Sequence, residues 1–142
     1  MRLSLAATAA TLFAAANARI TGIAVPETIK PGDTFDVVIE SSNYIQTVYD
    51  VAIAFGYAPG KGYPDSLFNV VGSFYLGPEE SNQLHNFNKT VTVPSTATKG
   101  EGVFSAGLYS LYGASSGTTL SNYNVSVTFG DKTSKKYKSS SA

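Results

Sequence analysis

From about residue 20 onward, short runs rich in Val, Ile, Phe, Tyr and Thr alternate with clusters of Gly, Pro, Asn and Ser. Branched and aromatic side chains favour the pleated backbone of a strand, whereas Gly and Pro interrupt hydrogen-bonded ladders. No stretch of useful length repeats apolar residues at the 3.6-residue period of a helix. The alternation therefore predicts an all-β protein.

Seven strands are expected, at intervals of about 10–15 residues. This number and spacing favour a two-sheet antiparallel β-sandwich of the immunoglobulin-like type, with a β-barrel as the alternative. The Cys and Trp signature of antibody domains is missing, so the fold prediction rests on spacing alone. The expected strands lie near residues 20–25, 35–40, 47–55, 67–76, 87–93, 103–112 and 120–129.

Strict alternation of apolar and polar residues predicts which side chains face the core. In the strand near 47–55, four large side chains are expected on one face: Tyr49, Val51, Ile53 and Phe55. Asp50 lies between them and is expected on the opposite face. The last strand is expected to turn Tyr123, Val125, Val127 and Phe129 inward and its polar residues outward.

Residues 1–18 have the pattern of a signal peptide. Arg2 is followed by an uncharged run over residues 3–15, and Ala16-Asn17-Ala18 has the small-x-small form of a cleavage site. A retained membrane helix is the alternative, but the run is shorter than the roughly 20 residues that span a bilayer. The pattern predicts secretion, with a mature chain that begins at Arg19.

The chain contains no cysteine. Disulfides, thiolate zinc sites and cysteine nucleophiles are therefore excluded, and stability must come from an apolar core. Removing 18 of the 142 residues leaves 124, which is long enough for one domain with such a core.

Charge is divided unevenly along the chain. Residues 19–130, the expected sandwich domain, hold five Lys and Arg against nine Asp and Glu, or −4, whereas residues 131–142 hold four Lys against one Asp, or +3. The composition of 131–142 predicts a Lys/Ser-rich disordered tail, with a functional basic motif as the alternative. Arginines do not cluster among aromatics and the chain end is not hydrophobic, so neither nucleic-acid binding nor a membrane anchor is expected.

Two acceptor sequons for N-glycosylation begin at Asn88 and Asn124. Both Asn side chains fall on the polar phase of their expected strands, as the modification requires. The alternative is that both are unmodified outward side chains.

The sequence gives little support to catalysis. Residues 113–117 match the G-x-S-x-G pattern of serine hydrolases, but the one histidine, His85, precedes Ser115 and no helix follows, so a hairpin loop is favoured. The acidic pairs Glu79 with Glu80 and Asp33 with Asp36 are not distinguishable from solvated loop acids. We expect no enzymatic activity, no metal and no cofactor.

Nine tyrosines and no tryptophan are the distinctive part of the composition. Rings with a polar end suit an interface that is partly wet, so the tyrosines favour a binding module, although each could simply close an end of the sandwich. Those expected at strand ends or in loops are Tyr44, Tyr57, Tyr63, Tyr75, Tyr109, Tyr112 and Tyr123.

Five ordered blocks resemble the necrosis-inducing secreted protein family of fungal effectors. They lie at residues 29–33 (IKPGD), 43–56 (NYIQTVYDVAIAFG), 75–82 (YLGPEESN), 108–117 (LYSLYGASSG) and 122–127 (NYNVSV). The resemblance spans the mature chain to about Gly130 and is much more specific than any short motif.

The resemblance implies a secreted virulence protein that suppresses pattern-triggered immunity in plants. Its implied targets are a receptor co-receptor kinase and the receptor-like cytoplasmic kinase downstream of it, which the effector binds and inhibits. The protein is then expected to be a monomer that acts in the host, in the host cytoplasm or at the plasma-membrane periphery. No residue roles are carried over by the resemblance.

Partner contacts are expected first at Glu79 and Glu80, because an acidic loop adds complementary charge, and next around Tyr109 and Tyr112. An apoplastic module that binds cell-wall carbohydrate is the alternative function, with tyrosines stacked on sugar rings. An undetected hydrolase is the third.

Overall fold

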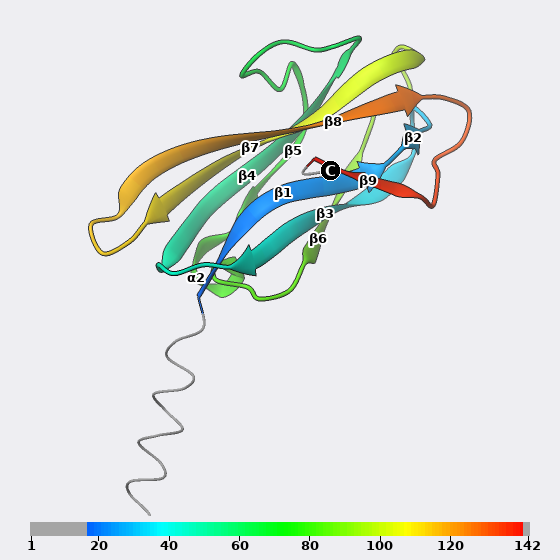
Figure 1. The fold of residues 1–142 in the computed structure, drawn as a ribbon. Coiled ribbons are helices and arrows are strands. Elements are labelled where there is room, and N and C mark those ends of the chain that lie inside the picture. Colours follow the sequence, from blue (N-terminus) through cyan, green and yellow to red (C-terminus); the bar gives the residue numbers. More distant parts are fainter. Residues whose placement is uncertain (1–16, 141–142) are drawn as a thin grey trace, which may run out of the picture.

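The computed structural model describes residues 17–140, which form two β-sheets packed face to face (Figure 1). The predicted β-sandwich is thus confirmed. The elements in chain order are β1 (Ala18–Pro26), β2 (Thr28–Ile29), β3 (Thr34–Asn43), β4 (Val48–Pro59), β5 (Asn69–Tyr75), α2 (Gly77–Glu80), β6 (Phe87–Thr92), β7 (Gly100–Tyr112), β8 (Gly117–Phe129) and β9 (Tyr137–Ser139).

The first sheet has the strand order β6-β3-β1-β9 and the second has β2-β8-β7-β4-β5. Every pairing is antiparallel except that of β2 with β8. The described part of the chain has nine strands, against the seven expected. The two additional strands, β2 and β9, are two and three residues long, so they leave no alternating pattern that sequence reasoning could detect.

The core lies between the sheets and is made of alternate residues from both. Phe35 of β3 meets Phe104 of β7 edge-on, with ring centroids 5.7 Å apart, and Phe104 in turn stacks on Phe55 of β4 at 6.0 Å. In β8 the inward phase is as predicted: Val125, Val127 and Phe129 are buried. Such burial is the main source of stability in a chain without disulfides.

A β-bulge in β4 reverses the predicted phase of its first half. The pairing of β4 with β7 shifts between Asp50 and Ala52, so that Val51 is the extra residue. Ile53 and Phe55 face the core as expected. Before the bulge, however, Asp50 is buried and Tyr49 is only half-buried. The prediction that Asp50 lies on the exposed face is therefore wrong, because one extra residue in a strand exchanges its two faces.

The basic C-terminal segment, predicted to be a disordered tail, is ordered up to residue 140. In Figure 1 its strand β9 (red) lies alongside the end of β1, where Ala24 pairs with Ser139 and Pro26 with Tyr137. Its charges meet opposite charges on the body: Lys99 Nζ is 2.6 Å from Asp131 and Lys136 Nζ is 3.8 Å from Glu27. Strand pairing thus overrides the composition of this segment.

Most of the predicted signal peptide lies outside the described residues. Of its 18 positions only Asn17 and Ala18 are described, and Ala18 begins β1 opposite Asn43. No helix within residues 17–140 has the length and apolar character needed to cross a membrane.

Candidate functional site

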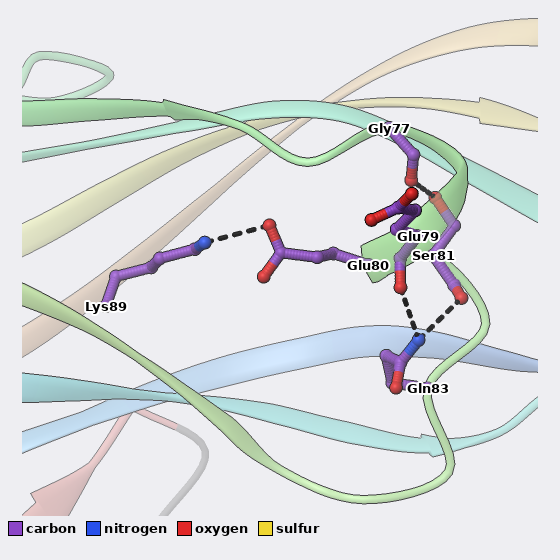
Figure 2. A network of polar contacts seen from close by, with 6 residues as sticks. All are labelled: Gly77, Glu79, Glu80, Ser81, Gln83 and Lys89. Carbon is purple, nitrogen blue, oxygen red and sulfur yellow. Dashed lines mark hydrogen bonds and ion pairs between the residues drawn. The ribbon is translucent and has the colours of Figure 1, made fainter.

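The predicted acidic contact site is a compact turn that follows β5 (Figure 2). Helix α2 is a single turn, with Gly77 at a φ of +71° and Pro78 in its first turn. The hydroxyl of Ser81 donates to the carbonyl of Gly77 at 2.7 Å, and the amide of Gln83 donates to the carbonyls of Glu79 and Ser81 at 3.0 and 3.2 Å. These bonds fix the turn and therefore the direction of its two carboxylates.

The two acids of this turn differ in their surroundings. Figure 2 shows Glu80 directed toward Lys89 of β6, with Oε1 2.8 Å from Nζ. Glu79 is exposed, and its carboxylate makes no ion pair with any residue of the described chain. The structure therefore leaves Glu79 available to a partner and gives Glu80 a structural role.

Next to the turn, large side chains line the outer face of the five-stranded sheet. The register places Tyr75 beside Ala52, Ala52 beside Tyr109 and Tyr109 beside Leu120, across four neighbouring strands. We name these four residues the outer row. Tyr75 is 67% exposed, Tyr109 37% and Leu120 79%. Because Ala52 is small, the larger neighbours stand above a flat strip of sheet.

The outer row and the acidic turn form one continuous surface. The Tyr75 ring lies against Gly77, where an added Cβ would be only 2.5 Å from ring atoms. The Tyr75 hydroxyl is also 2.9 Å from that of Tyr49, and this hydrogen bond raises the pKa of the Tyr49 phenol. The positive φ favours glycine at position 77, and an added Cβ would also force the exposed Tyr75 ring to shift.

Tyr112, predicted to act with Tyr109, lies elsewhere. The two residues are three apart on β7, so their side chains point to opposite faces of the sheet. Tyr112 meets Tyr44 edge-on at 5.7 Å, and the guanidinium of Arg19 lies 4.6 Å from the centre of the Tyr44 ring. The odd sequence separation of Tyr109 and Tyr112 on one strand could already have predicted that they face opposite sides of the sheet.

Beneath the turn lies a buried polar cluster that sequence reasoning missed. The Ser110 hydroxyl donates to the Asp50 carboxylate at 2.6 Å, and the backbone N–H of Asp50 donates to Ser81 Oγ at 2.8 Å. All three residues are buried. Burial raises the pKa of Asp50, because it disfavours the charged form, and the Ser110 bond opposes this shift. The one sequence feature that could have indicated this cluster is that Ser110 falls on the inward-facing phase of β7.

The residues considered for catalysis are not brought together. Residues 113–116 form the turn between β7 and β8, closed by the bond from the N–H of Ser116 to the carbonyl of Gly113, which confirms the hairpin loop. His85 is an exposed residue of the segment before β6. Asp33 accepts a hydrogen bond from Thr133, and Asp36 accepts one from Thr90.

Residues 17–140 include no group of three or more His, Asp or Glu side chains that could hold a metal ion. Both sequon residues, Asn88 on β6 and Asn124 on β8, are exposed as expected.

A family model described as the Nis1 family matches residues 16–128 of this chain. The chain belongs to the Nis1 family. The necrosis-inducing secreted protein 1 of Colletotrichum higginsianum is 61% identical over 137 residues, which are 96% of this chain and 94% of that protein. The protein of the same name from Colletotrichum orbiculare is 51% identical over 132 residues, 92% of this chain and 82% of that one. The resemblance drawn from the five sequence blocks is thereby confirmed.

Among solved structures, a superoxide reductase (neelaredoxin) from Ignicoccus hospitalis matches with a TM-score of 0.44 and 15% identity over 80% of each chain. A likeness of this degree says nothing about activity. The Nis1 match covers the acidic turn, the outer row and both sequons, so all of the surfaces described above lie within the shared domain.

Proposed function

We propose that this Nis1-family protein is a secreted fungal effector that induces necrosis and suppresses plant immunity by binding immune kinases and lowering their activity. The identity of 61% to a necrosis-inducing secreted protein over nearly the whole of both chains is the observation that carries the proposal. The proposed targets are the receptor co-receptor kinase and the receptor-like cytoplasmic kinase. Binding, rather than catalysis by the effector, is the proposed mode of action.

The surface made of the outer row and Glu79 is the proposed contact region. Exposed aromatic side chains are the usual anchors of protein interfaces. Tyr75 of β5 and Tyr109 of β7 are exposed and lie on either side of Ala52 in the strand between them. Leu120 extends the apolar strip, and Glu79 at its edge adds a negative charge that favours association with a basic surface. A flat strip of this kind suits a folded partner better than a small molecule, for which an enclosed site is usual.

Purified mature protein and the two kinase domains provide the direct test. We expect saturable binding in isothermal titration calorimetry or surface plasmon resonance. We also expect kinase autophosphorylation to fall as the effector is added. Replacing Tyr109 and Leu120 together by Ser should weaken binding at least about tenfold, the usual effect of removing a central anchor. Replacing Tyr44 by Ser is the matched control, because this ring lies with Tyr112 away from the outer row.

Absence of binding to either kinase domain by a protein with a normal unfolding transition would overturn the kinase proposal. Binding to insoluble chitin or glucan that is lost with the same outer-row substitutions would instead favour a carbohydrate-binding module. Equal losses from the outer-row and Tyr44 substitutions would remove the outer row from the interface.

A further inference from the structure

A groove of about 810 Å³ runs over the outer face of β7 and β8, further along these strands than the outer row. Its floor includes Val103 and Ser105 of β7 and Asn124 and Ser126 of β8, and residues 60–64 form part of its wall. The volume falls within the roughly 300–1,000 Å³ that is usual for sites of small molecules. Neither the acidic turn nor the outer row contributes to it.

The wall of the groove is held in place by contacts at several points. The N–H of Gly60 donates to the carbonyl of Glu101 at 2.8 Å, and Asn122 donates from Nδ2 to the Asp65 carboxylate at 3.2 Å. Within the wall, the Tyr63 ring stacks on that of Phe68 with centroids 4.9 Å apart. Tyr63 nevertheless remains 56% exposed and lines the groove, so its side chain is accessible to a ligand there.

The chemistry of the lining indicates a neutral ligand rich in hydroxyl groups. Two lysines, Lys61 and Lys138, are balanced by two carboxylates, Glu27 and Glu101, so the groove has no excess charge that would select an anion or a cation. Hydroxyl and amide side chains make up most of its floor, whereas ordinary small-molecule pockets are mostly apolar. A saccharide combines hydroxyl groups with an apolar ring face that an aromatic side chain can cover.

The sequon of β8 opens directly into this groove. Asn124 and Ser126, its first and third residues, are exposed and both line the groove, whereas Val125 between them is buried in the core. The hydroxyl of Ser105 donates to Asn124 Oδ1 at 2.8 Å. Because Oδ1 is held in this way, the amide nitrogen Nδ2 is the side-chain atom that makes no hydrogen bond with residues 17–140.

We propose that Asn124 carries an N-linked oligosaccharide whose first sugars lie in this groove, against Tyr63. The donor is an oligosaccharide linked to a polyprenol diphosphate. A bond forms between Asn124 Nδ2 and C1 of the terminal N-acetylglucosamine, the bond from C1 to the diphosphate oxygen breaks, and the proton that Nδ2 loses is taken up by solvent. The lipid diphosphate leaves with the bonding electrons, so no redox reagent is required.

The other sequon supplies a natural comparison. Asn88 lies on β6, opposite Val38, and is exposed, but it does not line the groove. A sugar on Asn88 would extend from the other sheet, so it would leave residues 60–64 unaffected.

The test uses the full chain secreted from a eukaryotic host. Glycopeptide mapping should find a hexosamine-based glycan on Asn124 that is absent from the Ser126→Ala variant and retained in Ser126→Thr, which preserves the sequon. Amide hydrogen exchange of residues 61–63 should then be several-fold slower in the wild type than in Ser126→Ala. Asn88→Gln should leave this protection unchanged.

The Tyr63→Ala variant separates attachment of the glycan from its placement. It should keep the glycan on Asn124, yet show no difference in loop exchange between the glycosylated protein and protein trimmed to one sugar by endoglycosidase H. Secretion of wild-type protein with Asn124 unmodified would overturn the proposal. A glycan on Asn124 without loop protection would overturn its placement in the groove. If secreted wild-type protein is unmodified at Asn124 and free N,N′-diacetylchitobiose slows loop exchange, the groove is a site for a free saccharide and the proposal fails.

Discussion

The Ser110 hydroxyl donates a hydrogen bond of 2.6 Å to the carboxylate of Asp50, and both residues are buried within the sandwich. The bond joins neighbouring strands at the bulge in β4, where the pairing with β7 shifts. It satisfies a carboxylate that would otherwise be costly to bury. The β4 bulge therefore places an ionisable group directly beneath the acidic turn.

Replacing Asp50 by Asn should change how stability depends on pH. Burial raises the pKa of Asp50 in the folded protein, so the folded state binds its proton more tightly than the unfolded chain. The stability contribution of this group is thus fully present below about pH 4, where an unperturbed Asp titrates, and is lost as the pH rises through the raised pKa. Urea unfolding across that range measures the free energy of unfolding of both proteins. The value for Asp50→Asn minus that for the wild type should increase with pH and then level off.

Parallel stability curves for the wild type and Asp50→Asn would mean that the carboxylate is not desolvated. Replacing Ser110 by Ala is the matched control: it removes the one interaction that opposes the pKa shift, so the fall in stability should extend to higher pH.

The reversal of phase at the bulge can be tested by truncating two neighbouring apolar residues. Ile53→Ala should lower the free energy of unfolding by about 2–5 kcal/mol, because its fully buried side chain leaves a cavity. Val51→Ala, at the bulge and only half-buried, should lower it by about 1 kcal/mol or less. Chemical denaturation measures both, and equal losses would contradict the bulge.

Deleting residues 131–142 should destabilise the protein, which a disordered tail would not do. The deletion removes β9 and the bond from the Tyr137 hydroxyl to the carbonyl of Asp36, at 2.8 Å. Several net hydrogen bonds of about 1 kcal/mol each make a loss of at least about 2 kcal/mol reasonable. The freed edge of β1 should also promote self-association, which size-exclusion chromatography would detect.

The matched control for this deletion is the double variant Lys132→Ser, Lys135→Ser. Both lysines are exposed and neither forms an ion pair with residues 17–140, so this variant lowers the charge of the segment without removing β9. Its stability should be that of the wild type. A loss as large as that of the deletion would assign the effect to charge rather than to strand pairing.

Charge reversal should affect the two acids of the turn differently. Glu79→Lys should weaken kinase binding, most strongly at low salt. Its free energy of unfolding should stay within about 0.5 kcal/mol of the wild-type value. Glu80→Lys places a second ammonium group beside Lys89, so it should reduce stability by about 1 kcal/mol. Unchanged affinity of Glu79→Lys at every salt concentration would remove the turn from the interface.

If the protein acts by binding, the double variant Ser115→Ala, His85→Ala should still suppress an immune oxidative burst in plant tissue. Both residues are exposed, so the fold should not change. Loss of suppression by a protein with a normal unfolding transition would instead support a hydrolytic mechanism.

Much of this fold was determined by the sequence alone, because strand burial has a period of two residues that is visible locally. The alternation over residues 123–129 predicted the inward side chains of β8, and the Gly/Ser-rich run 113–117 predicted its hairpin loop. The exposure of Asn88 and Asn124 followed from the same alternation. The five ordered blocks also predicted the family.

Other features were decided only by contacts between distant parts of the chain. The bulge that buries Asp50 is defined by the register of β4 against β7, some 60 residues away in the sequence. The basic C-terminal segment is ordered by its pairing with β1, more than 100 residues away. The groove beside Asn124 likewise requires residues 60–64 to fold over β7 and β8. Local alternation contains no information about register, partner strand or loop position, because these depend on which distant backbone groups complete one another's hydrogen bonds.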